Sequence, residues 1–167
     1  MNSDASGVES WMQIRPEGLY CVPADMYVDP HLPVENAIIT HGHADHARPG
    51  HRQIIATPET IAIMKTRYPD DAPLTVKTMA YGETMELPGN VDLRLVPAGH
   101  ILGSAQVVLE HAGGRIVISG DYKRHADPTC APFEVVSCDV FVTEATFALP
   151  VFSHPPLEHE IAKVIRS

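Results

Sequence analysis

The chain has 167 residues, 44% of them hydrophobic, and its 12 Lys and Arg residues against 21 Asp and Glu residues give a formal net charge of −9. This length falls within the usual range of one domain, and the composition excludes collagen-like, coiled-coil and disordered chains. The acidic balance argues against a protein that holds nucleic acid through a broad basic surface, because such binding depends on Lys and Arg neutralising phosphates.

Short apolar segments, separated by Pro and Gly, follow one another along most of the chain. Residues 1–15 precede them, and we expect these residues to form a flexible N-terminus. The segment 91–96 alternates apolar and polar residues as a half-buried strand does, and residues 111–114 are typical of a hairpin turn. We therefore predict strands over residues 18–22, 26–28, 37–40, 54–56, 91–96, 106–110, 115–119 and 139–143.

Two segments have the spacing of helices. In the first, Thr57 is a favourable N-cap and Pro58 suits the first helical position, and the helix would bury Ile61, Met64 and Tyr68 on one face. The second follows the Pro-Pro pair at 155–156 and carries apolar residues at helical spacing, namely Leu157, Ile161, Val164 and Ile165. We expect residues 153–167 to be the start of a linker or helix. An apolar helix face without a stop signal there suggests either a fragment or a docking element.

The sequence also limits where the protein acts. No apolar run approaches the roughly 18 residues of a membrane span, and the N-terminus lacks the basic start and apolar stretch of a signal peptide. The three cysteines (Cys21, Cys130 and Cys138) are an odd number without CxxC spacing, so they are predicted to be reduced. We expect a cytoplasmic protein that makes no contact with membranes.

Histidines are the most unusual feature of the composition. Four of the ten fall within eleven residues, and the segment 41–46 reads His-Gly-His-Ala-Asp-His at the end of an apolar strand. On an extended or turning backbone His41 and His43 can point at one centre, whereas Asp45 and His46 would serve a neighbouring centre. Imidazole with carboxylate suits zinc, iron or manganese, so this loop predicts a site for two metal ions.

Polar residues able to bind metal or move a proton also follow other predicted strands. Taken singly, each has an ordinary explanation as a turn, loop or capping residue. Because sites assemble at the carboxyl ends of neighbouring strands in layered α/β folds, we expect these residues to converge. They are Asp29, His41, His100, Asp121 and Glu144.

The motifs taken together resemble those of the metallo-β-lactamase superfamily. They are His-x-His-x-Asp-His at 41–46, Ala-Gly-His-Ile-Leu-Gly-Ser at 98–104 and Ser-Gly-Asp at 119–121. The segments Gly-Asp-Tyr-Lys-Arg at 120–124 and Thr-Glu-Ala-Thr-Phe at 143–147 are similar to those of the β-CASP nucleases, and among them of the bacterial ligase-associated DNA exonucleases. The resemblance covers almost the whole chain and implies an αββα sandwich that is incomplete here.

The resemblance also implies a role for each site residue. His41, His43 and His100 would hold one metal, Asp45 and His46 the second, and Asp121 would bridge both. Asp29, in preference to Asp25, would support the histidine loop from behind. Glu144 matches the carboxylate that partners a catalytic histidine, and Arg48, Lys123 and Arg124 are candidates for binding phosphate. The catalytic residues are thus expected to be Asp45, Asp121 and Glu144.

The expected function is a metal-dependent DNA exonuclease that uses a metal-bridging hydroxide, works in DNA repair and has a DNA ligase and a helicase as functional partners. Zinc is the favoured metal and manganese the alternative; RNA is the alternative substrate. Residues 16–152 would form the catalytic region. His154 and His159 come too soon after Glu144 to complete the second metal site, so we expect the missing histidines in or beyond a cap domain that this chain does not reach. Two other classes stay open: a thiolester- or lactam-cleaving hydrolase, and an inactive metal-binding fragment.

Overall fold

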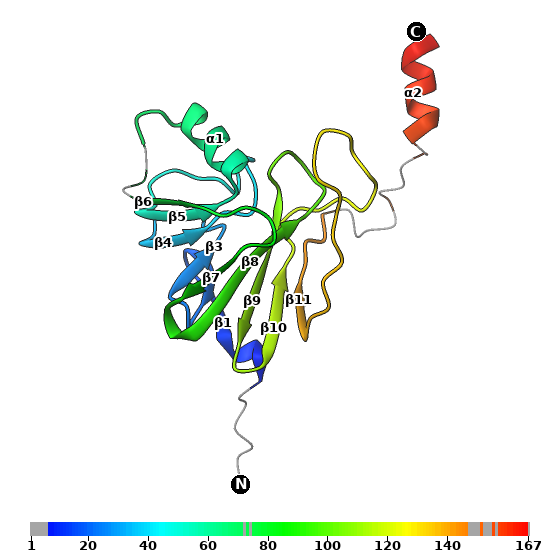
Figure 1. Cartoon of the computed structure of the whole chain (residues 1–167). Helices are drawn as coiled ribbons and strands as arrows, with labels where there is room; N and C mark the ends of the chain where they lie inside the picture. The colour runs from blue at the N-terminus through cyan, green and yellow to red at the C-terminus, as the bar shows by residue number, and fades with distance from the viewer. Residues whose placement is uncertain are drawn as a thin grey trace.

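The computed structural model describes residues 7–71, 73, 75–146, 151, 155 and 157–166. Two mixed sheets face each other (Figure 1). The first has the order β1-β2-β3-β4-β5-β6, with β1 (Met12–Arg15), β2 (Gly18–Cys21), β3 (Met26–Val28), β4 (Asn36–Ile38), β5 (Gln53–Ala56) and β6 (Thr75–Thr78). The second has the order β11-β10-β9-β8-β7, with β7 (Thr84–Leu87), β8 (Val91–Pro97), β9 (Ala105–His111), β10 (Gly114–Ile118) and β11 (Val140–Val142).

The core lies between the two sheets. In β8 the alternation seen in the sequence turns Val91, Leu93 and Leu95 inward, and all three are fully buried. They pack with Met26 and Ile38 of the first sheet. Burial of these apolar side chains holds the two layers together.

The outer faces of the sheets are covered differently. Helix α1 (Pro58–Arg67) packs Ile61 and Met64 against the outer face of the first sheet, as Figure 1 shows over β4 to β6. On the outer face of the second sheet, the partly buried Val136 and Cys138 pack against Val96, Val108 and Val117. The layers are therefore those of a partial metallo-β-lactamase-like fold, with a helix on one side and, within the described residues, an extended segment on the other.

Most predicted elements are confirmed. Thr57 caps α1 by accepting a hydrogen bond from the backbone N–H of Thr60, and β9 and β10 form the predicted hairpin, with His111 opposite Gly114. A second helix, α2 (Leu157–Arg166), lies where the apolar spacing predicted one. All three cysteines are free. None of the helices in the described ranges has the length and apolar character needed to cross a membrane.

Three strands, β1, β6 and β7, are not predicted by the sequence. The expectation of a flexible segment over residues 1–15 is wrong for residues 12–15, which form β1 and pair antiparallel with β2. A short 3-10 helix, η1 (Val8–Trp11), precedes β1, and another, η2 (Pro88–Asn90), links β7 to β8. Residues 1–6 lie outside the described residues.

The parallel pairs of strands determine where the long connections run. Because β4 and β5 are parallel, the chain between them must cross from one end of the sheet to the other. This crossover, residues 39–52, carries the histidine loop. The connection from β10 to its parallel neighbour β11, residues 119–139, carries Asp121.

Candidate metal centre

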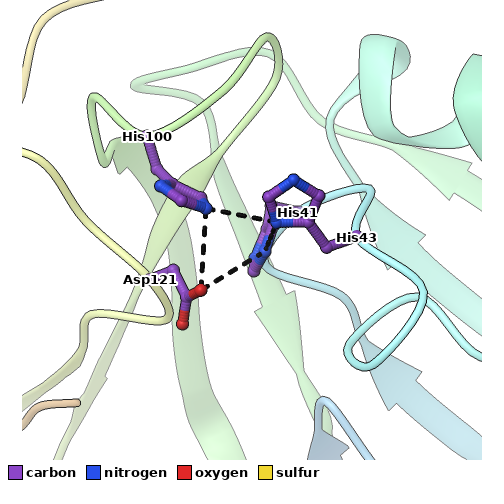
Figure 2. Close-up of side chains that lie close together, drawn as sticks. All are labelled: His41, His43, His100 and Asp121. Atoms are coloured by element: carbon purple, nitrogen blue, oxygen red, sulfur yellow. Dashed lines mark hydrogen bonds and ion pairs between the residues drawn. The ribbon is translucent and has the colours of Figure 1, made fainter. Parts of the chain in front are cut away.

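Four side chains meet at one end of the two sheets, as Figure 2 shows. His41 and His43 come from the loop after β4, His100 from the loop after β8 and Asp121 from the loop after β10. One ligand atom from each lies within 4.8 Å of the other three. His41 is fully buried, and the other three residues lie nearer the surface.

The distances between these atoms fit a tetrahedral metal site. His43 Nδ1 lies 3.0 Å from His41 Nε2 and 3.2 Å from His100 Nε2. Asp121 Oδ2 lies 3.9 Å from His41 Nε2 and 3.6 Å from His100 Nε2. Ligands bound to zinc at about 2.0–2.2 Å in a tetrahedron are roughly 3.3–3.6 Å apart. The donor set and its spacing therefore suit a divalent transition metal.

Asp45 and His46, which the sequence assigned to a second metal, lie on the other side of Asp121. The Oδ1 atom of Asp121 is 3.4 Å from Nε2 of His46, and the same nitrogen is 3.8 Å from Oδ2 of Asp45. The two carboxylate oxygens of Asp121 thus face two different sets of side chains. Asp45 is the most exposed member, since 73% of its side chain is accessible, and this second group is more open than the first.

Asp29 holds the histidine loop from behind. It follows β3 and takes up a left-handed backbone conformation, with φ of 45°. Its carboxylate accepts hydrogen bonds from the backbone N–H of Thr40 at 2.8 Å, from the Thr40 hydroxyl at 2.6 Å and from Nδ1 of His46 at 2.9 Å. Because an ionised carboxylate only accepts hydrogen bonds, Nδ1 of His46 carries the proton. The lone pair on Nε2 is then the one that could bind a metal ion.

Thr40 orients His41 in the same way. Its hydroxyl oxygen lies 3.0 Å from Nδ1 of His41 while donating its proton to Asp29. The Nδ1 atom of His41 is therefore the donor, and its Nε2 lone pair faces the cluster. Thr40 was not among the site residues expected from the sequence; its position directly before His41 was the only available signal.

The protonation of the histidines follows from their surroundings. Burial, reinforced by His46, His100 and His43, lowers the pKa of His41 to about 2, so its ring is neutral. Burial also lowers the pKa of His100, partly opposed by Asp121. At His46 burial favours the neutral ring, but the hydrogen bond and the charge of Asp29, with Asp121 and Asp45, outweigh burial and raise the pKa.

Glu144 lies close to this cluster, just after β11. Its Oε1 atom accepts a hydrogen bond from the backbone N–H of Tyr122 at 3.2 Å. Burial would raise the pKa of Glu144, but hydrogen bonds from Thr146 and from the Tyr122 N–H lower it below the usual value. The electrostatic interaction with His100 also lowers the pKa of Glu144. The Glu144 carboxylate is thus kept ionised.

The structure brings together all five strand ends that the sequence predicted to converge. Asp25 lies elsewhere, where it accepts a hydrogen bond from the Tyr20 hydroxyl at 2.7 Å. Of the candidates for binding phosphate, Lys123 is held by Asp127, with Nζ and Oδ2 3.0 Å apart. Arg48 Nε donates to the backbone oxygen of Asp45 at 3.2 Å, and Arg124 is exposed.

The sequence of this chain is similar to those of proteins named as enzymes of nucleic acids. A probable DNA ligase from Opitutus terrae is 32% identical over 140 residues, which are 83% of this chain and 14% of that protein. An RNase J-like protein from Methanocaldococcus jannaschii is 28% identical over 142 residues, 73% of this chain and 34% of that protein. Endoribonuclease YSH1 from Saccharomyces cerevisiae is 32% identical over 97 residues, 55% of this chain and 12% of that protein. No protein-family model matches the chain.

The chain thus spans about a third or less of the length of these relatives. In this chain, residues from the three histidine- and aspartate-containing motifs meet at one end of a two-sheet sandwich. The chain belongs to the metallo-β-lactamase superfamily, in its β-CASP nuclease branch.

Proposed function

We propose that the protein is a metal-dependent phosphodiesterase that hydrolyses nucleic acid, and that it acts as an exonuclease on DNA. The observation that carries this proposal is the position of Asp121. Its two oxygens face two separate groups of ligands, at 3.6 Å from His100 Nε2 and at 3.4 Å from His46 Nε2. A carboxylate between two such groups is suited to fixing the separation of two metal ions.

In this proposal one divalent ion is held by His41, His43 and His100, the other by Asp45 and His46, and Asp121 serves both. An imidazole-rich donor set favours zinc, with manganese as the alternative. Two such ions would lower the pKa of a bound water and neutralise the charge that builds on the phosphoryl oxygens. Asp29 and Thr40 keep the lone pairs of His46 and His41 directed at the site.

Phosphates flanking the reacting bond would be bound by Arg48 and Arg124, which lie next to the ligand loops. Lys123 is the weakest of the three candidates because its ammonium group already pairs with Asp127. With a chain charge of −9, contact with nucleic acid is concentrated at the metal centre and these few cations. Such a site favours engagement of one strand end over coating of a long duplex.

The similarity to a protein named as a probable DNA ligase supports DNA as the substrate and a role beside a ligase. A helicase as a further partner and a role in DNA repair belong to the same proposal. RNA is the alternative, because other relatives are named as ribonucleases. Glu144 favours a nuclease over a small-molecule hydrolase, since it holds an ionised carboxylate beside the metal cluster that thiolester or lactam cleavage does not require.

A panel of substrates tests this proposal. The zinc-loaded protein is incubated with end-labelled DNA, end-labelled RNA, bis(p-nitrophenyl) phosphate, a thiolester and a lactam. We expect release of nucleotides from DNA and of p-nitrophenolate from the phosphodiester, both lost in excess EDTA and restored by zinc. Turnover of the thiolester or lactam with all three phosphodiester substrates left intact would overturn the proposal in favour of a small-molecule hydrolase.

A further inference from the structure

Helix α1 contacts both of the loops that carry the histidine cluster. At its C-terminal end, Arg67 Nη1 donates a hydrogen bond of 2.7 Å to the backbone oxygen of Gly42. Gly42 stands between His41 and His43, so this bond holds the peptide that joins two of the four clustered residues. A charged donor to a carbonyl makes one of the stronger hydrogen bonds in proteins.

The same loop packs closely on the helix. A Cβ atom added at Gly42 would lie 2.8 Å from Cδ1 of Ile63, which is closer than such atoms approach in proteins. The backbone of the histidine loop therefore lies directly against α1, and any side chain at Gly42 would force Ile63 to move. Arg67 and Ile63 together fix the distance between the backbone of this loop and the helix.

At its N-terminal end, α1 holds the loop of His100. The Thr57 hydroxyl donates to the backbone oxygen of Gly103 at 2.7 Å, and the Thr60 hydroxyl donates to the same oxygen at 3.2 Å. Both threonines are buried. A Cβ atom at Gly103 would lie 2.7 Å from Cβ of Glu59, so this loop also touches the helix.

We propose that α1 is a bracket that sets the spacing between the two histidine loops, with Arg67 and Thr60 as positioning residues of the metal centre. This inference rests on the proposed metal centre. His41 and His43 arrive from the first sheet and His100 from the second, and α1 is bonded to the loops of both. A shift of either loop along the helix would move His100 Nε2 away from His43 Nδ1, which are 3.2 Å apart.

Arg67 is the better residue to test because it is exposed, so its replacement leaves the core intact. The variant Arg67→Met keeps much of the side chain and removes the donor, and Arg67→Lys restores a cation with a single donor group. Arg52→Met is the matched control: Arg52 is exposed and pairs with Glu35 at 3.0 Å, in a pair that includes no residue of the cluster. Thr57 also caps the helix, so Thr60→Val tests the other end more cleanly.

The experiment titrates each metal-free protein with Co²⁺ and records the visible absorption spectrum, with the melting temperature of the metal-free protein as a separate readout. We expect Arg67→Met and Thr60→Val to raise the dissociation constant for Co²⁺ about 10- to 100-fold, the range typical of residues that orient ligands, and to change the spectrum. Arg67→Lys should recover part of the affinity, and Arg52→Met should match the wild type.

If both Arg67→Met and Thr60→Val kept the wild-type affinity and spectrum, the proposed role of α1 would be refuted, whereas the proposed metal centre would not. Weaker binding that only follows a lower melting temperature, with an unchanged spectrum, would also refute that role, because that result describes a loss of fold stability. Failure of the wild type itself to bind Co²⁺ would instead refute the metal centre, and the bracket with it.

Discussion

The carboxylate of Asp29 lies 2.9 Å from Nδ1 of His46, although the two residues are 17 positions apart in the chain. The same carboxylate binds Thr40 through both its backbone N–H and its hydroxyl. One partly buried acid therefore fixes the ring orientation of His46 directly and that of His41 through Thr40. Asp29 thus supports the site from outside: it contacts Nδ1 of His46, whereas Nε2 of His46 is the atom that faces the cluster.

The substitution Asp29→Asn is expected to weaken metal binding. An amide cannot accept all three hydrogen bonds without turning its NH₂ group toward one of the donors, so the orientation of His46 is lost. We expect the affinity for the more weakly bound zinc ion to fall about 10- to 100-fold in calorimetric titration. Asp25→Asn is the matched control, because Asp25 binds Tyr20 away from the cluster. Equal zinc affinities for both variants would contradict this role for Asp29.

The two groups of ligands should differ in affinity. His41, His43, His100 and Asp121 are already within 4.8 Å of one another, whereas the second group has only Asp45 and His46 beside the shared Asp121, and Asp45 is 73% exposed. After zinc loading and gel filtration, elemental analysis should find about one tightly held zinc ion per chain, with a second that binds weakly. Two ions that both survive gel filtration at full occupancy would show that this difference is wrong.

The three cysteines should differ in reactivity. Cys21 is fully buried, and burial raises the pKa of its thiol above the usual value. The pKa of the Cys130 thiol is raised as well, by partial burial and by Asp127, so access of the reagent to the sulfur separates Cys21 from the other two. We expect Cys130 and Cys138, which are partly exposed, to react with a thiol reagent first, and Cys21 only after the protein is unfolded in guanidinium. Mass mapping that finds Cys21 modified as fast as the other two would contradict the burial described.

The packing between the sheets is tested by Leu93→Ala. Leu93 has no exposed surface and lies in the core that joins both sheets. Its truncation should lower the free energy of unfolding by about 2–5 kcal/mol, measured by urea denaturation. Ile14→Ala serves as control, since Ile14 is 93% exposed and its truncation should cost less than about 0.5 kcal/mol. A loss at Leu93 no larger than at Ile14 would mean that the two sheets do not share this core.

The strands that the sequence missed, β1, β6 and β7, all lie at sheet edges, although one edge strand, β11, was predicted. An edge strand pairs on one side only and buries few side chains; in β6, Val76 is the one apolar residue. In β1 and β7 the apolar and polar residues alternate over only four residues, which is too short a pattern to predict a strand. Pairing with the neighbouring strand decides such a segment, and that information lies outside it.

The site shows the same division between local and distant information. The histidine loop could be predicted because three imidazoles and a carboxylate stand within six residues. Thr40 and Arg67 could not, because threonine and arginine are common, and their roles depend on contacts with Asp29 and Gly42 across 11 and 25 positions. The pairing of Lys123 with Asp127 likewise became visible only in the folded chain.

The central claim is that phosphodiester hydrolysis depends on a metal centre containing Asp121, and one measurement tests it most directly. The rate of nucleotide release from end-labelled DNA is compared between wild-type protein and Asp121→Asn, both stripped with EDTA and then reloaded with zinc. Asp121 is partly exposed and contributes no core volume, so the variant should fold and melt as the wild type does. We predict slow, zinc-dependent release by the wild type and a rate at least about 100-fold lower in the variant. Equal, zinc-independent rates for the two proteins would contradict the claim.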